Sequence, residues 1–424
     1  MKRHILRVMA LALTFTLTGC GAPANVSEET TDPLAIDPNA TRIEAPNLDT
    51  SDDTTTTSGG TAAVTTKPAE TTAPASTETR ISFLAAGDNI IHENVYTDAK
   101  NRASGDEKYN FIDMYDGIAD WVKAADLAFI NQETMMGGDE LGISGYPNFN
   151  SPQAAGEAIV QLGFDIVNIA TNHMLDKKDA GLLGTIDFFE SKPVTLLGGH
   201  KNKEDYQNIR VVECKGVKIA FLSYTYGLNG MTTNKGSEIY IPLIDQAEIV
   251  NMVNKAETLA DCVIVVMHWG DENKFTVSNE QKTLASAISK AGADVILGMH
   301  SHTVQPVEWI DNADGSRTLC IYSLGNLIST MYNNYNMVGG IMTFDIVKDK
   351  DGVTIENPIY NPVITHYDKN RLGLQVYMYE DYTAELAAAH GTVYWGTEKR
   401  FSLDYINQLV KGVIDPRFLP EFMK

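Results

Sequence analysis

From residue 81 onward, short runs of apolar residues alternate with stretches in which apolar positions recur every three or four residues. The first pattern is typical of buried β-strands and the second of helices that pack on a sheet. Continuous apolar strands that alternate with helices favour a mostly parallel sheet with helices on both faces. Strands are predicted at 81–86, 127–130, 164–170, 193–197, 209–214, 217–224, 262–267 and 293–297, and helices at 111–125, 151–162, 177–191, 245–260 and 278–291.

After residue 302 the pattern changes to strands, which are predicted at 303–310, 319–323, 339–347 and 353–364. They indicate an antiparallel continuation of the sheet or a second layer. The expected fold is α/β: a layered sheet core flanked by helices over 80–365, antiparallel β additions, and a helical C-terminal extension over 366–424. The aromatic residues of this extension, Tyr377, Tyr379 and Trp395, are expected to pack rather than to form a sugar or peptide platform.

The first residues resemble a secretion signal. Lys2, Arg3 and Arg7 precede an apolar stretch that is shorter than the roughly 20 residues needed to span a bilayer. Leu17-Thr18-Gly19-Cys20 resembles the lipobox of bacterial lipoproteins, which implies cleavage after residue 19 and lipidation of Cys20. An ordinary signal peptide with an incidental cysteine is the alternative. Residues 20–79 are rich in Thr, Ser and Pro and are expected to form a disordered linker.

The formal net charge of −22 argues against nucleic acid as a partner. It does not exclude phosphate or carboxylate ligands, because a bound metal supplies local positive charge. Besides Cys20, the chain contains Cys214, Cys262 and Cys320, each in or beside an apolar run and without metal-binding or disulfide spacing. We expect buried free thiols.

Polar side chains with metal-binding chemistry follow the predicted strands at five places. Because the carboxyl ends of parallel strands meet at one edge of a sheet, these side chains are expected to converge there. Carboxylate, amide and imidazole groups together suit a divalent metal ion such as Mn, Zn, Fe or Mg. The candidate ligands are Asp88, Glu133, Asn172, His268, His300 and His302.

Each candidate also has a purely structural interpretation. Asp88 alone is better explained as a helix cap or loop residue, and Asn131 with Glu133 as solvated loop chemistry. Asn172 and His173 fit the start of a helix that Asp176 caps. A structural role for all of them is less favoured, because they share one topological position. His92 is expected at the surface or behind the metal ligands.

The motifs taken together resemble the CapA/PgsA family of bacterial capsule and poly-γ-glutamate synthesis proteins, itself similar to the calcineurin-like metallophosphoesterases. The resemblance runs from about residue 81 to 344 and implies a metallophosphoesterase-like core. The matching motifs are Gly87-Asp88, Asn131-x-Glu133, Ala170-Thr171-Asn172-His173 with Asp176, His268-Trp269-Gly270-x-Glu272, Gly298-x-His300-x-His302-x-x-Gln305-Pro306, and Ser323-Leu324-Gly325-Asn326.

The chain departs from the phosphoesterase pattern at three places. Asp88 is followed by Asn89-Ile90, where that pattern has a metal-binding histidine two residues after the aspartate. Asn131-Gln132-Glu133 replaces a Gly-Asp-x-x-Asp element, and Met174 rather than an acid follows the Asn-His pair.

The resemblance implies a lipid-anchored protein on the extracellular face of the bacterial membrane. It would serve synthesis, export or attachment of an anionic surface polymer, with membrane ligase or export subunits as partners. Alternatives are a metal-dependent phosphoesterase acting on a phosphorylated envelope substrate, and a non-catalytic polymer-binding subunit. The expected catalytic residues are His173, as general acid, Asp88 and His268. The residues expected around the substrate or behind the ligands are Asn131, Asp176, Glu272, Asn326 and His92.

Overall fold

A computed structural model describes residues 78–396 and 400–424. The expected signal peptide, the lipidated Cys20 and all but the last residues of the linker lie outside the described residues. Within the described part, no helix is both long enough and apolar enough to cross a membrane.

The first sheet contains the first and the last strand of the described region, β1 and β14. Its order is β14-β13-β12-β1-β2-β3-β4, and β11 pairs with the end of β1. Neighbours from β1 to β4 run parallel, whereas β12, β13 and β14 extend the sheet in antiparallel fashion. The strands are β1 (Thr79–Asn89), β2 (Leu127–Gln132), β3 (Ile166–Asn168), β4 (Thr195–Leu197), β11 (Asn326–Ile328), β12 (Val338–Lys348), β13 (Val353–His366) and β14 (Gln375–Met378).

The second sheet has the order β5-β6-β7-β8-β10-β9, with parallel pairing from β6 through β7 and β8 to β10. The expectation of one sheet carrying all five ligand positions is therefore wrong, because the parallel strands divide between two sheets. The predicted α/β class with antiparallel additions is confirmed. The strands are β5 (Arg210–Cys214), β6 (Val217–Thr225), β7 (Cys262–His268), β8 (Val295–Met299), β9 (Val307–Asp311) and β10 (Arg317–Ile321).

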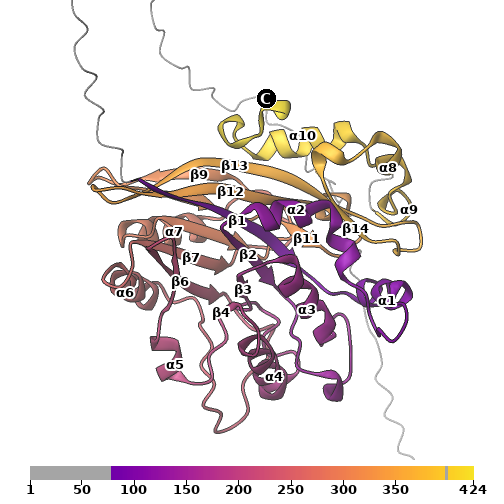
Figure 1. The fold of residues 1–424 in the computed structure, drawn as a ribbon, viewed down its shortest axis with the longest axis horizontal. Coiled ribbons are helices and arrows are strands. Elements are labelled where there is room, and N and C mark those ends of the chain that lie inside the picture. The colour runs from indigo at the N-terminus through magenta and orange to yellow at the C-terminus, as the bar shows by residue number, and fades with distance from the viewer. Residues whose placement is uncertain (1–77, 397–399) are drawn as a thin grey trace, which may run out of the picture. The chain divides into compact units, whose positions relative to one another are not determined.

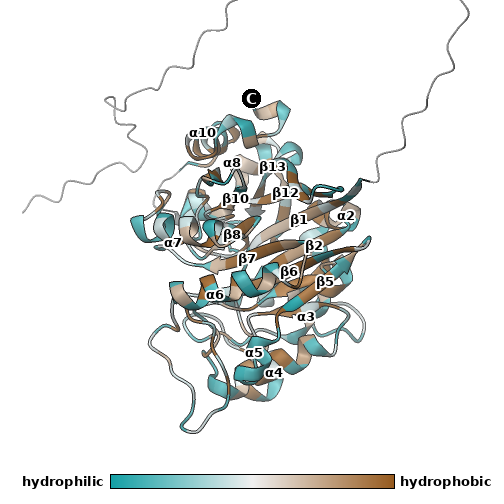
Figure 2. Ribbon diagram, turned by 90° about the vertical axis from the view of Figure 1, so that its left-hand side faces the viewer, coloured by the Kyte–Doolittle hydropathy of each residue, from teal (hydrophilic) through white to brown (hydrophobic). Residues whose placement is uncertain are grey.

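The two sheets pack face to face, as alternate residues of the second sheet show. Phe221 and Ile264 belong to the large core shared with the first sheet, and the Phe221 ring lies 6.3 Å from that of Phe83 on β1. Their neighbours Leu222 and Val265 point the other way, into a smaller core. Helices α6 and α7 cover that core. Figure 2 shows hydrophobic colouring along the strands and hydrophilic segments on α6.

Helices cover the outer faces of both sheets, and α10 lies along β12 and β13 in Figure 1. Three ends follow the sequence signals closely: α3 stops at Gly163 with a φ of 102°, Asp245 caps α6, and Ser278 forms a capping box on α7. The helices are α1 (Glu93–Arg102), α2 (Asp116–Ala124), α3 (Gln153–Leu162), α4 (Lys178–Glu190), α5 (Lys203–Gln207), α6 (Gln246–Glu257), α7 (Asn279–Lys290), α8 (Ala384–Ala389), α9 (Thr392–Trp395) and α10 (Leu403–Val413).

Some local predictions need correction. β3 contains only three residues, because the chain turns away after Asn168 toward the loop that holds His173. Lys177, not Asp176, precedes α4, and no side chain caps that helix. The structure contains α1, β11 and β14, which the apolar pattern did not predict. All three described cysteines are free; Cys262 and Cys320 are buried, while Cys214 is half-buried.

Candidate metal centre

The ends of β1, β2 and β3 place three polar side chains in one row. Asp88 pairs in register with Asn131, and Asn131 with Asn168. The side chains continue this row, since Asn131 donates to Asp88 Oδ1 at 2.7 Å and Asn168 donates to Asn131 Oδ1 at 2.6 Å. Ser223 of the second sheet donates to Asn168 Oδ1 and ends the row. One oxygen of the Asp88 carboxylate is thereby fixed, and the other, Oδ2, faces the second sheet.

The second sheet contributes its donors at the ends of β7 and β8. His268 ends β7, and His300 and His302 follow β8 with φ angles of 95° and 55°. Such angles are rare outside glycine and are found where function or packing enforces them. Here they turn the loop so that the His300 amide donates to Asp88 Oδ2 at 3.2 Å. The loop also brings the His300 and His302 rings to 5.9 Å between centroids.

Asp88, Glu133 and His302 form a buried set of possible metal ligands. His302 Nδ1 lies 3.4 Å from Asp88 Oδ2, and His302 Nε2 lies 3.6 Å from Glu133 Oε1. One ligand atom from each of the three residues lies within 4.8 Å of the other two. This set joins both sheets, because Asp88 lies at the end of β1, Glu133 follows β2 and His302 follows β8.

Glu272, His300 and His302 form a second set that meets the same distance limit. Sequence reasoning placed Glu272 behind the ligands, but the structure places its carboxylate among them. Glu272 is exposed while both histidines are buried, so this set faces solvent. His302 belongs to both sets and would be shared if two ions were bound.

His268 and Asn172 lie beside these sets rather than within them. His268 Nε2 donates to Asn172 Oδ1 at 2.9 Å, and the His268 ring lies 4.7 Å from that of His300. Asn172 also donates to Asn229 at 3.2 Å. Of the six predicted ligands, the structure therefore groups Asp88, Glu133, His300 and His302 with Glu272, and pairs His268 with Asn172 alongside.

Several buried atoms here lack a hydrogen-bond partner, which is uncommon in folded proteins. They are Glu133 Oε2, His268 Nδ1 and His300 Nδ1. Since His268 donates through Nε2, its Nδ1 carries a buried lone pair that receives no hydrogen bond. Two imidazole nitrogens and one carboxylate oxygen without donors match the chemistry of a divalent cation.

The pKa shifts of the buried histidines and of Glu133 also favour a cation-binding site. Burial, followed by the nearby histidines, holds the pKa values of His268 and His300 well below their usual range, so both rings are neutral and able to bind metal. Burial raises the pKa of Glu133 well above normal, against the opposing charge of His302. Burial lowers the pKa of His302, but Glu133 and Asp88 outweigh it and raise that pKa to about 10. Without metal, a proton on His302 therefore compensates the buried carboxylates.

His173 is oriented by Asp176. Its Nδ1 donates to Asp176 Oδ2 at 2.7 Å, and its Nε2 lies 3.9 Å from Glu133 Oε1. Asp176 Oδ2 also accepts from the Phe149 amide at 2.7 Å, and the Phe149 ring packs edge-on against His173 at 4.8 Å. Asp176 thus holds the Nδ1–H and leaves Nε2 facing the candidate ligands, where the neutral ring accepts a proton and the imidazolium donates one.

Asn326 and His92 belong to neither ligand set but form hydrogen bonds near them. Asn326 Oδ1 accepts from His302 Nδ1 at 3.0 Å, while the Asn326 amide donates to the Asn336 carbonyl at 3.0 Å. His92 Nδ1 accepts the Thr330 amide at 3.2 Å, and burial lowers the pKa of His92 to about 3. His92 is therefore a neutral acceptor that holds the segment after β11.

Sequence reasoning missed residues at the end of β6. Tyr226 lies just beyond that strand, 46% exposed, with its ring 4.4 Å from that of His300. Ser223 and Asn229 also take part, through Asn168 and Asn172. Their position in the chain could have indicated them, because β6 ends at the same sheet edge as β7 and β8.

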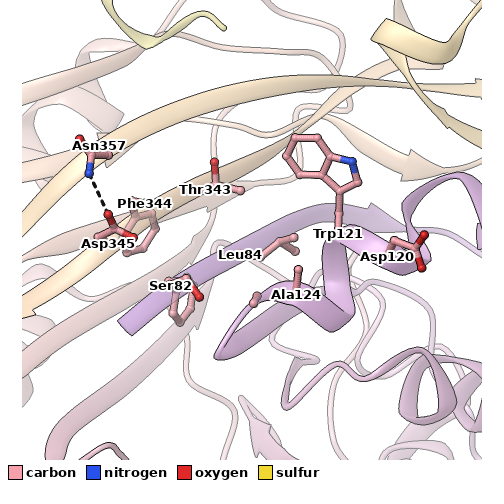
Figure 3. A pocket seen from close by; sticks show the side chains of 11 residues that line it. Ser82, Leu84, Asp120, Trp121, Ala124, Thr343, Phe344, Asp345 and Asn357 are labelled. Atoms are coloured by element: carbon pink, nitrogen blue, oxygen red, sulfur yellow. Dashed lines mark hydrogen bonds between the residues drawn. The ribbon is translucent and has the colours of Figure 1, made fainter. Parts of the chain in front are cut away.

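A cavity of about 310 Å³ opens beside the centre. Tyr226, Trp269, Asp271 and Gln281 are among its lining residues, so it lies between the end of β6 and the start of α7. A larger hollow of about 500 Å³ lies elsewhere, between α2 and the strands β1 and β12 (Figure 3). Its lining contains two carboxylates, Asp120 and Asp345, but no histidine, and Asp345 is already bound by an arginine and an asparagine, both at 2.8 Å, so this hollow offers no comparable chemistry.

Comparison with known proteins identifies the family. The model of the bacterial capsule synthesis protein PGA_cap matches residues 82–331, which is more than half of the chain. This chain belongs to the PGA_cap family. The match includes every residue of the two candidate ligand sets.

Two curated relatives resemble this PGA_cap protein over part of their length. The capsule biosynthesis protein CapA of Bacillus anthracis is 29% identical over 234 residues, 52% of this chain and 55% of that protein. The PGA biosynthesis protein CapA of Bacillus subtilis (strain 168) is 30% identical over 174 residues, 41% of this chain and 44% of that protein. The chain thus spans about half the length of the curated relatives that it matches.

Solved structures resemble the PGA_cap chain more distantly. A hypothetical protein from Thermus thermophilus has a TM-score of 0.40 at 15% identity, covering 66% of this chain and 99% of that one. The calcineurin-like phosphoesterase YfkN of Bacillus subtilis has a TM-score of 0.37 at 13% identity, covering 66% and 91%. With TM-scores below 0.5, neither likeness bears on activity.

Proposed function

We propose that this protein serves synthesis, export or attachment of an anionic capsule polymer of the poly-γ-glutamate type, using a divalent-metal centre of hydrolase type. The family and the names of its two CapA relatives support the polymer. The observation that carries the metal centre is the pair of ligand sets that share His302.

A divalent ion held by these residues would supply Lewis acidity toward an oxygen of the substrate. Asp88, Glu133 and His302 would hold it in the buried set, and Glu272 with His300 in the outer one. Exchange of the His302 proton for a cation keeps the buried carboxylates compensated. The donors include nitrogen as well as oxygen, which suits Mn, Zn or Fe better than Mg.

The other residues of the centre act on the substrate. His173, oriented by Asp176, would act through Nε2: in its doubly protonated form it would give that proton to the leaving group at a phosphoryl or acyl centre. Tyr226 covers His300 and would limit access of water from that side. The cavity lined by Tyr226 and Trp269 would receive the part of the substrate next to the reacting bond.

The location is also part of the proposal. Lipidation of Cys20 would hold the protein at the extracellular face of the membrane, where ligase or export subunits of a polymer synthesis complex would meet it. Cys20→Ala should then release the protein from washed membranes into the medium. Retention of the variant in the membrane fraction would contradict anchoring through this thiol.

One experiment tests the centre. Purified protein is loaded with Mn²⁺ or Zn²⁺, its bound metal is measured after gel filtration, and hydrolysis of bis-p-nitrophenyl phosphate and of poly-γ-glutamate is followed. His302→Gln should lose both metal and turnover. His200→Gln is the matched control, because His200 is another buried histidine but belongs to neither ligand set.

Each outcome is informative. Absence of bound metal in the unaltered protein would refute the centre. Bound metal without turnover on either substrate would favour a non-catalytic polymer-binding subunit. Metal-dependent cleavage of the phosphodiester alone would favour a phosphoesterase that acts on another envelope substrate.

A further inference from the structure

A cluster of aromatic and basic side chains lies on the C-terminal extension and on the loop after β11, and all of them but the half-buried Arg371 are exposed. Trp395 is 52% exposed and Tyr332, on the loop after β11, is 53% exposed. The expectation that the aromatic residues of the extension pack therefore fails for Trp395, although Tyr377 and Tyr379 do pack against the core. We call this cluster the aromatic-basic patch; it consists of Tyr332, Lys369, Arg371, Tyr394 and Trp395.

Direct contacts join four of the five patch residues into two pairs. The Arg371 guanidinium lies 4.2 Å from the centre of the Tyr332 ring and donates to the Tyr332 hydroxyl at 2.8 Å. The Trp395 indole donates to the Lys369 carbonyl at 2.6 Å, which holds the exposed Lys369 beside the indole. Figure 1 shows α8 and α9 on the side of the molecule toward which β1 and β2 point.

The patch is connected to the candidate metal centre through one segment. Arg371 donates to the Thr330 carbonyl, and the Thr330 amide donates to His92. The neighbouring Met331 sulfur accepts from Asn326 at 3.5 Å, and Asn326 accepts from His302. The arginine of the patch is thus held two hydrogen bonds from a residue behind the centre.

The two cations of the patch lack acidic partners. In the described part of the chain neither Lys369 nor Arg371 forms an ion pair, and the neighbouring Asp368 carboxylate accepts the amides of residues 370 and 372 instead. Most other described arginines bind a carboxylate, namely Arg80, Arg102, Arg210 and Arg417. In a chain with a net charge of −22, two unpaired cations beside exposed aromatic rings favour an anionic ligand.

We propose that the aromatic-basic patch binds an extended polycarboxylate chain and leads it to the metal centre. The inference rests on the proposed function, because its ligand is the polymer named there. Arginine binds carboxylates through two parallel hydrogen bonds, and lysine adds a mobile charge. The faces of Tyr332 and Trp395 would pack against the amide and methylene groups between successive carboxylates.

The test is binding of a short, fluorescein-labelled poly-γ-glutamate oligomer to the full chain, followed by anisotropy at low and high salt. Lys369→Gln and Arg371→Gln should each weaken binding about fivefold, the factor for roughly 1 kcal/mol, and reduce its salt dependence. The Lys369 side chain is exposed and forms no ion pair with the described residues, so Lys369→Gln remains decisive if Arg371→Gln disturbs the fold.

Arg317→Gln is the matched control. Arg317 also lies over an aromatic ring, 3.9 Å from that of Trp309, without a carboxylate partner among the described residues. It begins β10, so it lies at the sheet edge opposite the centre. An equal loss of affinity in Arg317→Gln would indicate a general charge effect and overturn the patch. Unchanged binding in Lys369→Gln, or tight binding of a neutral dextran oligomer, would overturn it as well.

A separate variant distinguishes this inference from the proposed function. His300→Ala should abolish turnover but leave oligomer binding within about twofold. If Lys369→Gln and Arg371→Gln both hydrolyse the phosphodiester fully and bind the oligomer normally, the patch is refuted. The proposed function would then still stand. Loss of oligomer binding in those variants, in a protein that hydrolyses nothing, would refute the catalytic centre and leave the patch standing.

Discussion

The metal-free protein should lose stability as the pH rises from 7 to 8.5. In the folded state the pKa of His302 is about 10, because Glu133 and Asp88 outweigh the effect of burial, whereas in the unfolded chain it is about 6.5. A raised pKa contributes stability that is complete below the unfolded value and is lost as the pH rises toward the folded value. Glu133 acts in the same direction, because burial raises its pKa as well.

The size of this loss of stability follows from the pH interval between 7 and 8.5. Between pH 7 and 8.5 the folded chain holds one proton more than the unfolded chain at His302, which gives a slope of about 1.4 kcal/mol per pH unit. The free energy of unfolding should therefore fall by about 2 kcal/mol. For a folded region of this size the corresponding fall in Tm is about 3 °C.

Bound metal should cancel this slope, because the metal-loaded folded chain and the unfolded chain hold nearly the same number of protons at His302. A cation must displace the His302 proton, so its affinity rises with pH, and its contribution to stability rises with its affinity. The assay is urea unfolding at both pH values, with chelator and with excess Mn²⁺. His302→Asn should reduce the metal-free slope, and the remainder should come from Glu133.

His92→Gln is the control for the pH experiment. The pKa of His92 is about 3, so His92 does not titrate in this window and the slope should remain. A metal-free slope that is unchanged in His302→Asn would refute the assignment of the compensating proton to this imidazole. Equal slopes with and without Mn²⁺ would show that the cation does not bind there.

Three further outcomes are expected. Glu272→Gln should leave at least half of the bound metal measured by mass spectrometry, because only the outer set loses a donor, whereas His302→Gln should leave none; equal losses would contradict two overlapping sets. His173→Gln should lower kcat by about 10²-fold or more with metal retained, and Asp176→Asn by less, since Asp176 only orients the ring; normal kcat in His173→Gln would exclude it as the proton donor. Gly87→Ala should give little folded protein, as judged by circular dichroism, because its Cβ would lie 2.0 Å from a carbonyl oxygen of the β10–β11 loop; a stable variant would refute that close approach.

Where an apolar run ends in a polar residue, the sequence led to residues that the structure groups as possible ligands or places beside them. Asp88, His268 and His300 each follow such a run, and the carboxyl ends of parallel strands share an edge. The division into two sheets was not predictable in this way, because the pairing partners of a strand are not encoded in its own pattern. The centre is consequently built where two sheets meet rather than along one.

Physical reasons also explain why the sequence did not reveal the roles of some residues of the centre. Asn168 and Ser223 lie within apolar runs, so their hydrogen bonds to the Asp88 row are visible only once β3 and β6 face each other. Glu272 reaches the centre because Gly270 and Asn273 turn the loop with φ angles of 84° and 60°. Asp176 was available to cap a helix, but the His173 ring and a backbone amide occupy its carboxylate instead.

The pairing of β14 with β13 has a consequence for any shortened version of this protein. Residues 363–366 of β13 are paired with β14, and the first two of them also pair with β12 on the other side. Ending the chain at residue 365 would remove β14 and leave the amides and carbonyls on that side as an open edge, which other molecules can extend into aggregates. In the intact chain β14 forms this edge of the sheet instead, and a strand of only four residues offers little backbone to a neighbouring copy.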